Sequence, residues 1–165
     1  MNLNIVTVRG GRKPQRALVE KVAYFCIGEL MPRHRTLDID ILLTKTFEEG
    51  AWAWVHAGET DRDFYMEVDK RIEYFKNGKK KKCGRELLIA TICHEMVHVM
   101  QTATGRMIDR VIPKKDGYRR LWKNYRTGKY VDHTKTPYSK LPWERQAYRM
   151  QEELLKKFLL HEEKG

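Results

Sequence analysis

Residues 84 to 105 constrain the fold more than any other segment of the sequence. Placed on an α-helix at about 100° per residue, they leave only a narrow polar stripe, and the rest of the helix surface is apolar. The apolar positions are Leu87, Leu88, Ile89, Ile92, Cys93, Met96, Val97, Val99 and Met100. A helix on the protein surface would carry a broad charged face. The segment therefore predicts a buried helix around which the other elements must pack.

The polar stripe of this helix contains His94, Glu95 and His98, which form the pattern HExxH. Side chains four residues apart project from one face of a helix, so both imidazoles can bind the same metal ion. Glu95 lies about 100° further round the helix and can reach a water molecule on that ion. Five-residue patterns arise by chance, but isolated charged groups in a buried helix are costly unless they are paired or bound to metal. The stripe therefore predicts a zinc site with two histidine ligands and Glu95 as general base.

A catalytic zinc ion usually has three protein ligands and one water, so a further ligand must come from elsewhere in the chain. The extended pattern HExxHxxGxxH is excluded, because Gln101 and Thr104 stand where it needs glycine and histidine. Glu144, in the first turn of the last predicted helix, is the leading candidate, although acidic residues are common there because they complement the helix dipole. The other candidates are His133, which is the strongest of them, Asp132 and Asp109.

The rest of the chain predicts a single α+β domain over residues 1–165. Alternating apolar and polar residues predict strands at 4–8, 37–44, 51–57 and 63–68. Apolar residues three and four apart predict two more helices, at 12–31 and 142–161. We expect a solvated loop at 70–83 and an irregular basic segment at 106–138, with a small hairpin at 122–131. The expected fold is a small mixed twisted sheet with an N-terminal helix, the HExxH helix and a C-terminal helix.

The two site segments, 94–98 and 142–147, resemble those of gluzincin-type zinc metallopeptidases, in which a glutamate on a later helix completes the HExxH site. The Pro-x-Glu-x-x-Ala setting of Glu144 is similar to that of small phage and bacterial zincin-like proteins, including the SprT-like and ImmA/IrrE-like groups. SprT proteins usually offer a histidine as third ligand, so this chain departs from them. The resemblance covers residues 37–160. It implies a minimal zincin that hydrolyses peptide bonds, with zinc held by His94, His98 and Glu144 in a cleft below an edge strand.

Such a peptidase also needs a donor for the oxyanion of the tetrahedral intermediate. Tyr148, one turn beyond Glu144 on the same helix face, is the expected donor. The alternatives are Tyr138, Tyr130, His133 and Arg145. The peptide substrate is expected to add as a strand to the edge of the sheet, at 51–57 or 63–68.

The charge of the chain is unevenly distributed. Lys and Arg number 33 against 22 Asp and Glu, a net charge of +11. Basic residues concentrate at 79–82 and 110–129, where Trp122 and several tyrosines lie among them. This composition suits a nucleic-acid surface, although a solubilising face is the commoner meaning of a lysine run. Two other classes therefore stay open: a nucleic-acid-binding protein with a structural metal site, and a regulatory protein with a degenerate zincin fold. The presence of Glu95 argues against the second.

Cysteine usage and hydropathy favour the cytoplasm. The three cysteines, Cys26, Cys83 and Cys93, are too few for a disulfide scaffold. Cys93 points away from the two histidines on the helix and is predicted to be a buried core thiol. Residues 1–11 lack a signal-peptide pattern, and no apolar run is long enough to span a membrane. These features do not distinguish a cytoplasmic protein from one carried in a virion.

Overall fold

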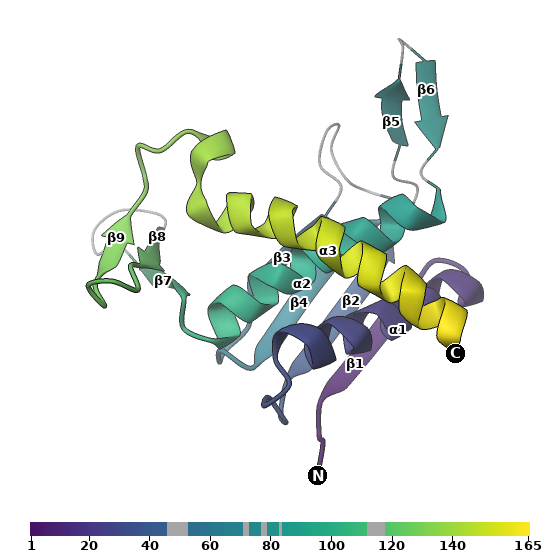
Figure 1. Ribbon diagram of the computed structural model, residues 1–165, viewed down its shortest axis with the longest axis horizontal. Helices are drawn as coiled ribbons and strands as arrows, with labels where there is room; N and C mark the ends of the chain where they lie inside the picture. The colour runs from purple at the N-terminus through teal and green to yellow at the C-terminus, as the bar shows by residue number, and fades with distance from the viewer. Residues whose placement is uncertain (46–52, 71–72, 77–78, 83, 112–117) are drawn as a thin grey trace.

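A four-stranded mixed sheet forms the base of the protein, and the helices are stacked on one of its faces (Figure 1). The computed structural model describes residues 1–45, 53–70, 73–76, 79–82, 84–111 and 118–165. The strand order is β1-β2-β4-β3. The strands are β1 (Ile5–Gly10), β2 (Asp38–Thr44), β3 (Ala53–Ala57) and β4 (Asp63–Asp69). Strands β1, β2 and β4 run parallel to one another, whereas β3 pairs antiparallel with β4 and forms one edge of the sheet.

The sheet buries one face, and its register aligns the apolar residues of neighbouring strands. Alternate residues of β2 and β4 are buried, and their pairing brings Ile39 opposite Phe64 and Ile41 opposite Met66. Because successive side chains of a strand point to opposite faces, this alternation creates one apolar surface for the helices to cover. The four predicted strands are confirmed in the described residues. A tight turn joins β3 to β4, and in it the Gly58 N–H donates to the carbonyl of Asp63. Residues 51 and 52 of the predicted third strand lie outside them.

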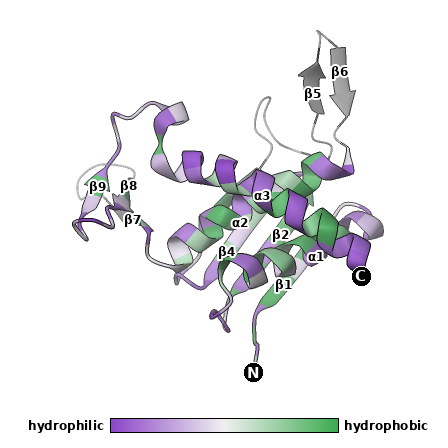
Figure 2. Ribbon diagram, in the orientation of Figure 1, coloured by the Kyte–Doolittle hydropathy of each residue, from purple (hydrophilic) through white to green (hydrophobic). Residues whose placement is uncertain are grey.

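The described residues form three α-helices: α1 (Lys13–Leu30), α2 (Arg85–Ala103) and α3 (Pro142–Lys164). Helix α2 lies between the sheet and α3, and it also packs against α1. Nearly every residue of α2 from Leu88 onward is buried, so the predicted buried helix is confirmed. A helix enclosed on several sides has no need of a charged face. In Figure 2 the first half of α3, which is the outer layer, is largely hydrophilic.

Two expectations for the connecting segments were wrong. Residues 70–83, expected to be a loop, contain the antiparallel hairpin of β5 (Glu73–Lys76) and β6 (Lys79–Lys82), which projects from the body of the protein (Figure 1). The lysine run of β6 has no apolar alternation, so only its backbone pairing with β5 makes it a strand. The segment expected to be mostly irregular contains a three-stranded antiparallel sheet of β7 (Met107–Val111), β8 (Tyr118–Lys123) and β9 (Tyr130–Asp132).

Within that second sheet, the hairpin predicted at 122–131 is confirmed. Trp122 pairs with Val131, and Lys123 pairs with Tyr130. Gly128, in the turn, has a φ of 70°, a conformation that glycine adopts without strain. The basic residues at 112–117 lie outside the described part of the chain.

The thiol of Cys93 is fully buried, as predicted, and lies in the core between α1 and α2. Its Sγ is 3.8 Å from that of Cys26, which is equally buried. The hydrogen bond with Cys93 and the burial of the thiol raise the pKa of Cys26. Cys83 is outside the described residues. Among those residues, no helix is both long enough and apolar enough to cross a membrane.

Candidate metal centre

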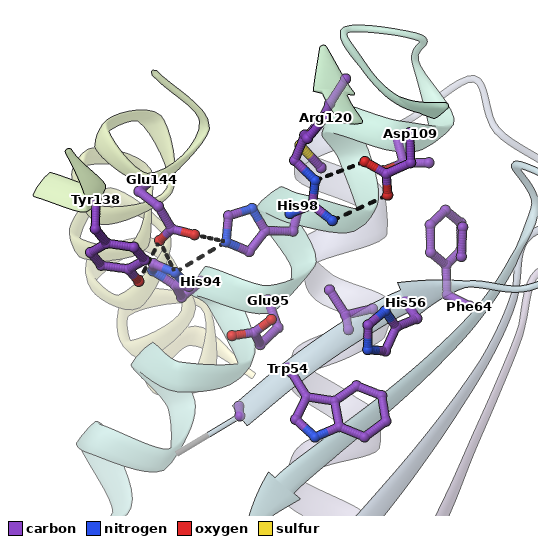
Figure 3. A pocket seen from close by; sticks show the side chains of 15 residues that line it. Trp54, His56, Phe64, His94, Glu95, His98, Asp109, Arg120, Tyr138 and Glu144 are labelled. Atoms are coloured by element: carbon purple, nitrogen blue, oxygen red, sulfur yellow. Dashed lines mark hydrogen bonds and ion pairs between the residues drawn. The ribbon is translucent and has the colours of Figure 1, made fainter. Parts of the chain in front are cut away.

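The side chains of His94, His98 and Glu144 meet between α2 and the first turn of α3 (Figure 3). The Nε2 atoms of the two histidines are 3.2 Å apart. One carboxylate oxygen of Glu144 lies 3.2 Å from Nε2 of His94, and the other lies 3.1 Å from Nε2 of His98. Two imidazole nitrogens and both oxygens of one carboxylate therefore meet between two helices.

The spacing of these atoms fits a tetrahedral ion. Zinc binds imidazole nitrogen and carboxylate oxygen at about 2.0–2.2 Å, which places neighbouring ligand atoms of a tetrahedron roughly 3.3 Å apart. The distances of 3.1 and 3.2 Å are close to that value. The three residues are the one group of His, Cys, Asp and Glu side chains in the described residues with the spacing of a metal site. This group could hold a metal ion; its donor types suit zinc, among other divalent transition metals.

Local sequence explains how Glu144 reaches the histidines. Pro142 is the first residue of α3, where its missing N–H costs nothing and its fixed φ favours the helix. Trp143 and Ala147 are buried, and the small side chain of Ala147 lets α3 approach α2 closely. Glu144 is then held in the first turn, facing the polar stripe of α2.

The outer nitrogens of both histidines also have partners. The Nδ1 of His98 lies 2.8 Å from Oε1 of Gln101, and the Nδ1 of His94 lies 2.8 Å from Oε1 of Gln151. With the amide oxygens facing the rings, as the structure has them, each Nδ1 carries the proton, because an amide oxygen only accepts hydrogen bonds. In the neutral imidazoles both Nε2 atoms then present lone pairs to each other and to the carboxylate of Glu144. Such a cluster of acceptors requires a cation, either a proton or a metal ion.

The titration behaviour of the metal-free cluster reflects this need for positive charge. Burial disfavours the charged form of Glu144, but the hydrogen bonds from His94 and His98 outweigh it and hold the pKa of that carboxyl well below its usual range. Burial also lowers the pKa of His98, yet the hydrogen bond to Glu144 and the charge of Glu95 raise it above the ordinary value of 6.5. The carboxylate of Glu144 and the ring of His98 thus each favour the charged form of the other.

Glu95 lies beside the cluster and is buried, yet it lines the adjoining cleft. Burial raises its pKa above the usual value, although the two histidines lower it in part. In Figure 3 its carboxylate lies between α2 and strand β3 and does not join the ligand cluster. A buried carboxylate with a raised pKa next to a metal site is the arrangement expected of a general base.

The cleft beside the cluster has a volume of about 210 Å³ and runs along the edge strand β3. All five residues of β3, from Ala53 to Ala57, line it. Since alternate side chains of a strand point to opposite faces, a cleft that touches every residue must follow the strand's edge. The cleft is also lined by Met107 and by the ion pair of Asp109 with Arg120, whose closest atoms are 2.9 Å apart.

The other predicted ligands lie elsewhere. The ring of His133 packs against Trp143, and its Nδ1 is 3.1 Å from the hydroxyl of Thr136. Asp132 accepts hydrogen bonds from Thr134, and the carboxylate of Asp109 is bound to Arg120. The structure therefore brings Glu144, and none of its three rivals, to the two histidines.

The predicted oxyanion donors differ in their access to the cleft. Tyr148 is half exposed and packs edge-on against the ring of His94, with 4.6 Å between ring centroids, and it is absent from the described lining of the cleft. Tyr138, one of the alternatives, lines the cleft, and its hydroxyl donates to Glu144 at 3.1 Å. It belongs to the short helix η1 (Tyr138–Lys140) just before α3. Partial burial and the hydrogen bond with Tyr148 raise the pKa of Tyr138, so its hydroxyl keeps its proton.

The other three alternatives, Tyr130, His133 and Arg145, are absent from the described lining of the cleft. The hydroxyl of Tyr130 donates to the carbonyl of Gly105, and Arg145 is exposed on the outside of α3. Sequence reasoning gave no role in the site to Gln101 or Gln151. Gln101 could have been noticed, because it lies on the same stripe of α2 as His98, whereas Gln151 belongs to another helix and gives no such signal.

Comparisons with models of known protein families, with curated proteins and with solved structures found no match to this chain. Its function must therefore be inferred from the chemistry of the site.

Proposed function

We propose that the protein is a zinc-dependent metallopeptidase of the minimal zincin type, as the sequence resemblance implies. The observation that carries the proposal is the convergence of His94, His98 and Glu144 within 3.1–3.2 Å of one another, beside a buried Glu95. Three protein ligands leave a fourth position of a tetrahedral ion for water, which is the arrangement of catalytic zinc sites. A purely structural site would normally be closed by four protein ligands.

The residues around the site have distinct tasks in this mechanism. Zinc, when bound, supplies a Lewis acid and lowers the pKa of its water to about 7. Glu95 accepts the proton of the attacking water and later delivers it to the leaving amine. Burial raises the pKa of Glu95 above its usual value, which favours the transfer of a proton to it.

The edge of β3 provides a place for the substrate. Its outer edge has no partner strand among the described residues, so its backbone N–H and C=O groups are available to an extended peptide. A peptide added there would pass through the cleft and bring a carbonyl to the metal site. Between the two edges predicted from the sequence, β3 is favoured, because β4 is paired on both sides.

Tyr138 is the best-placed residue to stabilise the oxyanion. Its hydroxyl lies within hydrogen-bonding distance of Glu144 and faces the cleft, whereas the predicted donor Tyr148 packs behind His94. The protonated phenol of Tyr138, which reaches the site from η1, can donate a hydrogen bond to an oxygen that gains charge in the transition state. The role of Tyr148 in catalysis stays a prediction, tested below against that of Tyr138.

Zinc content and hydrolysis, measured on the same preparation, test the proposal. We expect about one zinc ion per chain, cleavage of an unfolded protein substrate, loss of cleavage with a chelator, and recovery on adding zinc. Tight zinc binding without cleavage of any unfolded or peptide substrate would favour the alternative of a structural metal site. The suggested nucleic-acid contacts through 79–82 and 110–129 remain a separate prediction, for which salt-dependent DNA binding is the test.

A further inference from the structure

Gln101 is completely buried on α2, one turn beyond His98. Its Oε1 lies 2.8 Å from Nδ1 of His98. Its Nε2 donates to the carbonyl of Trp143 at 3.0 Å and to Oε1 of Gln146 at 2.9 Å. All the hydrogen-bonding atoms of this side chain are thus engaged, and they connect α2 with the first turn of α3.

The contact with Trp143 fixes which way the amide faces. A backbone carbonyl only accepts hydrogen bonds, so the NH₂ group of Gln101 must point toward it. The amide oxygen must then face His98, and it can accept only if Nδ1 carries the proton. In the neutral imidazole this leaves the lone pair on Nε2, the atom that faces Glu144 and His94.

We propose that Gln101 is a positioning residue that selects the metal-binding tautomer of His98 and ties that ring to the turn carrying Glu144. The link is short: the carbonyl that orients Gln101 belongs to Trp143, the residue immediately before Glu144. Movement of α3 away from α2 would therefore disturb two of the three ligands together. The proposal rests on the zinc site proposed above.

A neutral amide suits this place better than the carboxylate often found behind zinc-bound histidines. Glu95 and Glu144 already place two negative charges around the site, enough to balance a divalent cation. A third carboxylate at position 101 would be fully buried and unbalanced, which is costly. Gln101 holds the imidazole without adding charge.

Gln151 makes the corresponding contact with His94, but its orientation is less constrained. It is only partly buried, and its Nε2 donates a long hydrogen bond, of 3.4 Å, to the exposed side chain of Glu152. The amide of Gln151 can therefore rotate at little cost. We expect the two glutamines to differ in importance, with Gln101 dominant.

The experiment compares Gln101→Met with Gln146→Met. The first removes the amide that contacts His98 while roughly keeping its volume, and the second removes a partner of Gln101 but leaves both the Trp143 and His98 contacts. Two properties are measured: zinc affinity by competition with a chelator, and the tautomer of His98 by ¹⁵N NMR of the metal-free protein at a pH where the ring is neutral. Thermal unfolding of each metal-free variant records any purely structural effect.

We expect Gln101→Met to weaken zinc binding by about 10–100-fold, the usual effect of losing an outer partner of a ligand. The His98 spectrum should change from a single Nδ1–H form to a mixture, and Gln146→Met should leave both properties close to wild type. Unchanged affinity and an unchanged tautomer in Gln101→Met would overturn the proposal. If that variant does not fold, the wild-type protein decides the question: a neutral His98 ring that carries its proton on Nε2 would overturn the proposal.

The two proposals fail in different ways. If the wild-type protein binds no zinc, the proposed metallopeptidase is wrong, and the tautomer of His98 in the metal-free protein still tests the role of Gln101. If the wild type binds zinc and Gln101→Met binds it equally well with the same tautomer, only the role of Gln101 is wrong.

Discussion

The Nε2 of His94 lies 3.2 Å from the carboxylate of Glu144, although 50 residues separate them in the chain. The contact exists because the first turn of α3 packs against the middle of α2. The chain between the two helices forms the second sheet and η1. Its described residues supply no member of the ligand group. The stability of the α2–α3 contact and the affinity of the metal site are therefore expected to change together.

Replacement of Glu144 by alanine should abolish tight zinc binding. The variant removes one of three protein ligands and leaves two buried imidazoles, so the loss should exceed the roughly 10–100-fold effect of an outer-shell change. Metal analysis after dialysis measures it, with Glu153→Ala, an exposed change on the same helix, as the control. Full zinc stoichiometry in Glu144→Ala would require another third ligand, and His133 would be examined first.

Zinc affinity should fall as the pH is lowered through the pKa of His98. In the metal-free protein this pKa is raised above 6.5 by the hydrogen bond to Glu144 and the charge of Glu95, which outweigh burial. Zinc binds only the deprotonated ring, so a proton competes with it below that pKa, by about tenfold per pH unit for one proton. Above that pKa this competition disappears. Chelator competition between pH 5 and about 9 would show it, and a pH-independent affinity across neutrality would contradict it.

Enlarging Ala147 should weaken the junction between the helices. Ala147 is completely buried where α3 meets α2, so Ala147→Leu must push the helices apart, at a cost of about 1–3 kcal/mol in the free energy of unfolding. Zinc affinity should fall as well, because Glu144 moves with α3. Ala17→Leu, at an exposed position of α1, is the matched control and should change stability by no more than about 0.5 kcal/mol. Equal stability and affinity in the two variants would contradict this account of the packing.

Two tyrosine variants separate the candidate oxyanion donors. Tyr138→Phe removes the hydroxyl that faces the cleft and should lower kcat by about 10²–10³-fold, with zinc content retained. Tyr148→Phe keeps the ring that packs on His94 and should have a much smaller effect. Steady-state hydrolysis of a peptide substrate gives both values. The reverse order of effects would restore Tyr148 as the donor predicted from the sequence.

The parts of the fold with a strong hydrophobic period were predictable from the sequence. The apolar surface of α2 and the alternation in β2 and β4 are repeated over enough residues to fix both the type of element and its buried face. Strands β5, β6 and β7 were missed because they are short and have no such period; backbone pairing makes them strands. A lysine run in particular gives no sign of the strand that β6 forms.

The residues of the site were predictable only where they share one helix or lie at the start of another. His94, Glu95 and His98 share a stripe of one helix, and Glu144 follows a proline that marks a helix start. Which of several acidic or histidine residues reaches that stripe depends on how α3 docks, which no local pattern specifies. The same holds for Tyr138 and for the amide of Gln101, whose partners come from a different element.

Glu95→Gln tests the central claim most directly. The substitution preserves the shape of the side chain and all three ligands but removes the carboxylate that would accept the proton. Zinc content and hydrolysis of an unfolded protein substrate are measured on the same wild-type and variant preparations. The account predicts one zinc ion in each protein and hydrolysis in the wild type alone. Hydrolysis at the wild-type rate by zinc-loaded Glu95→Gln would contradict it.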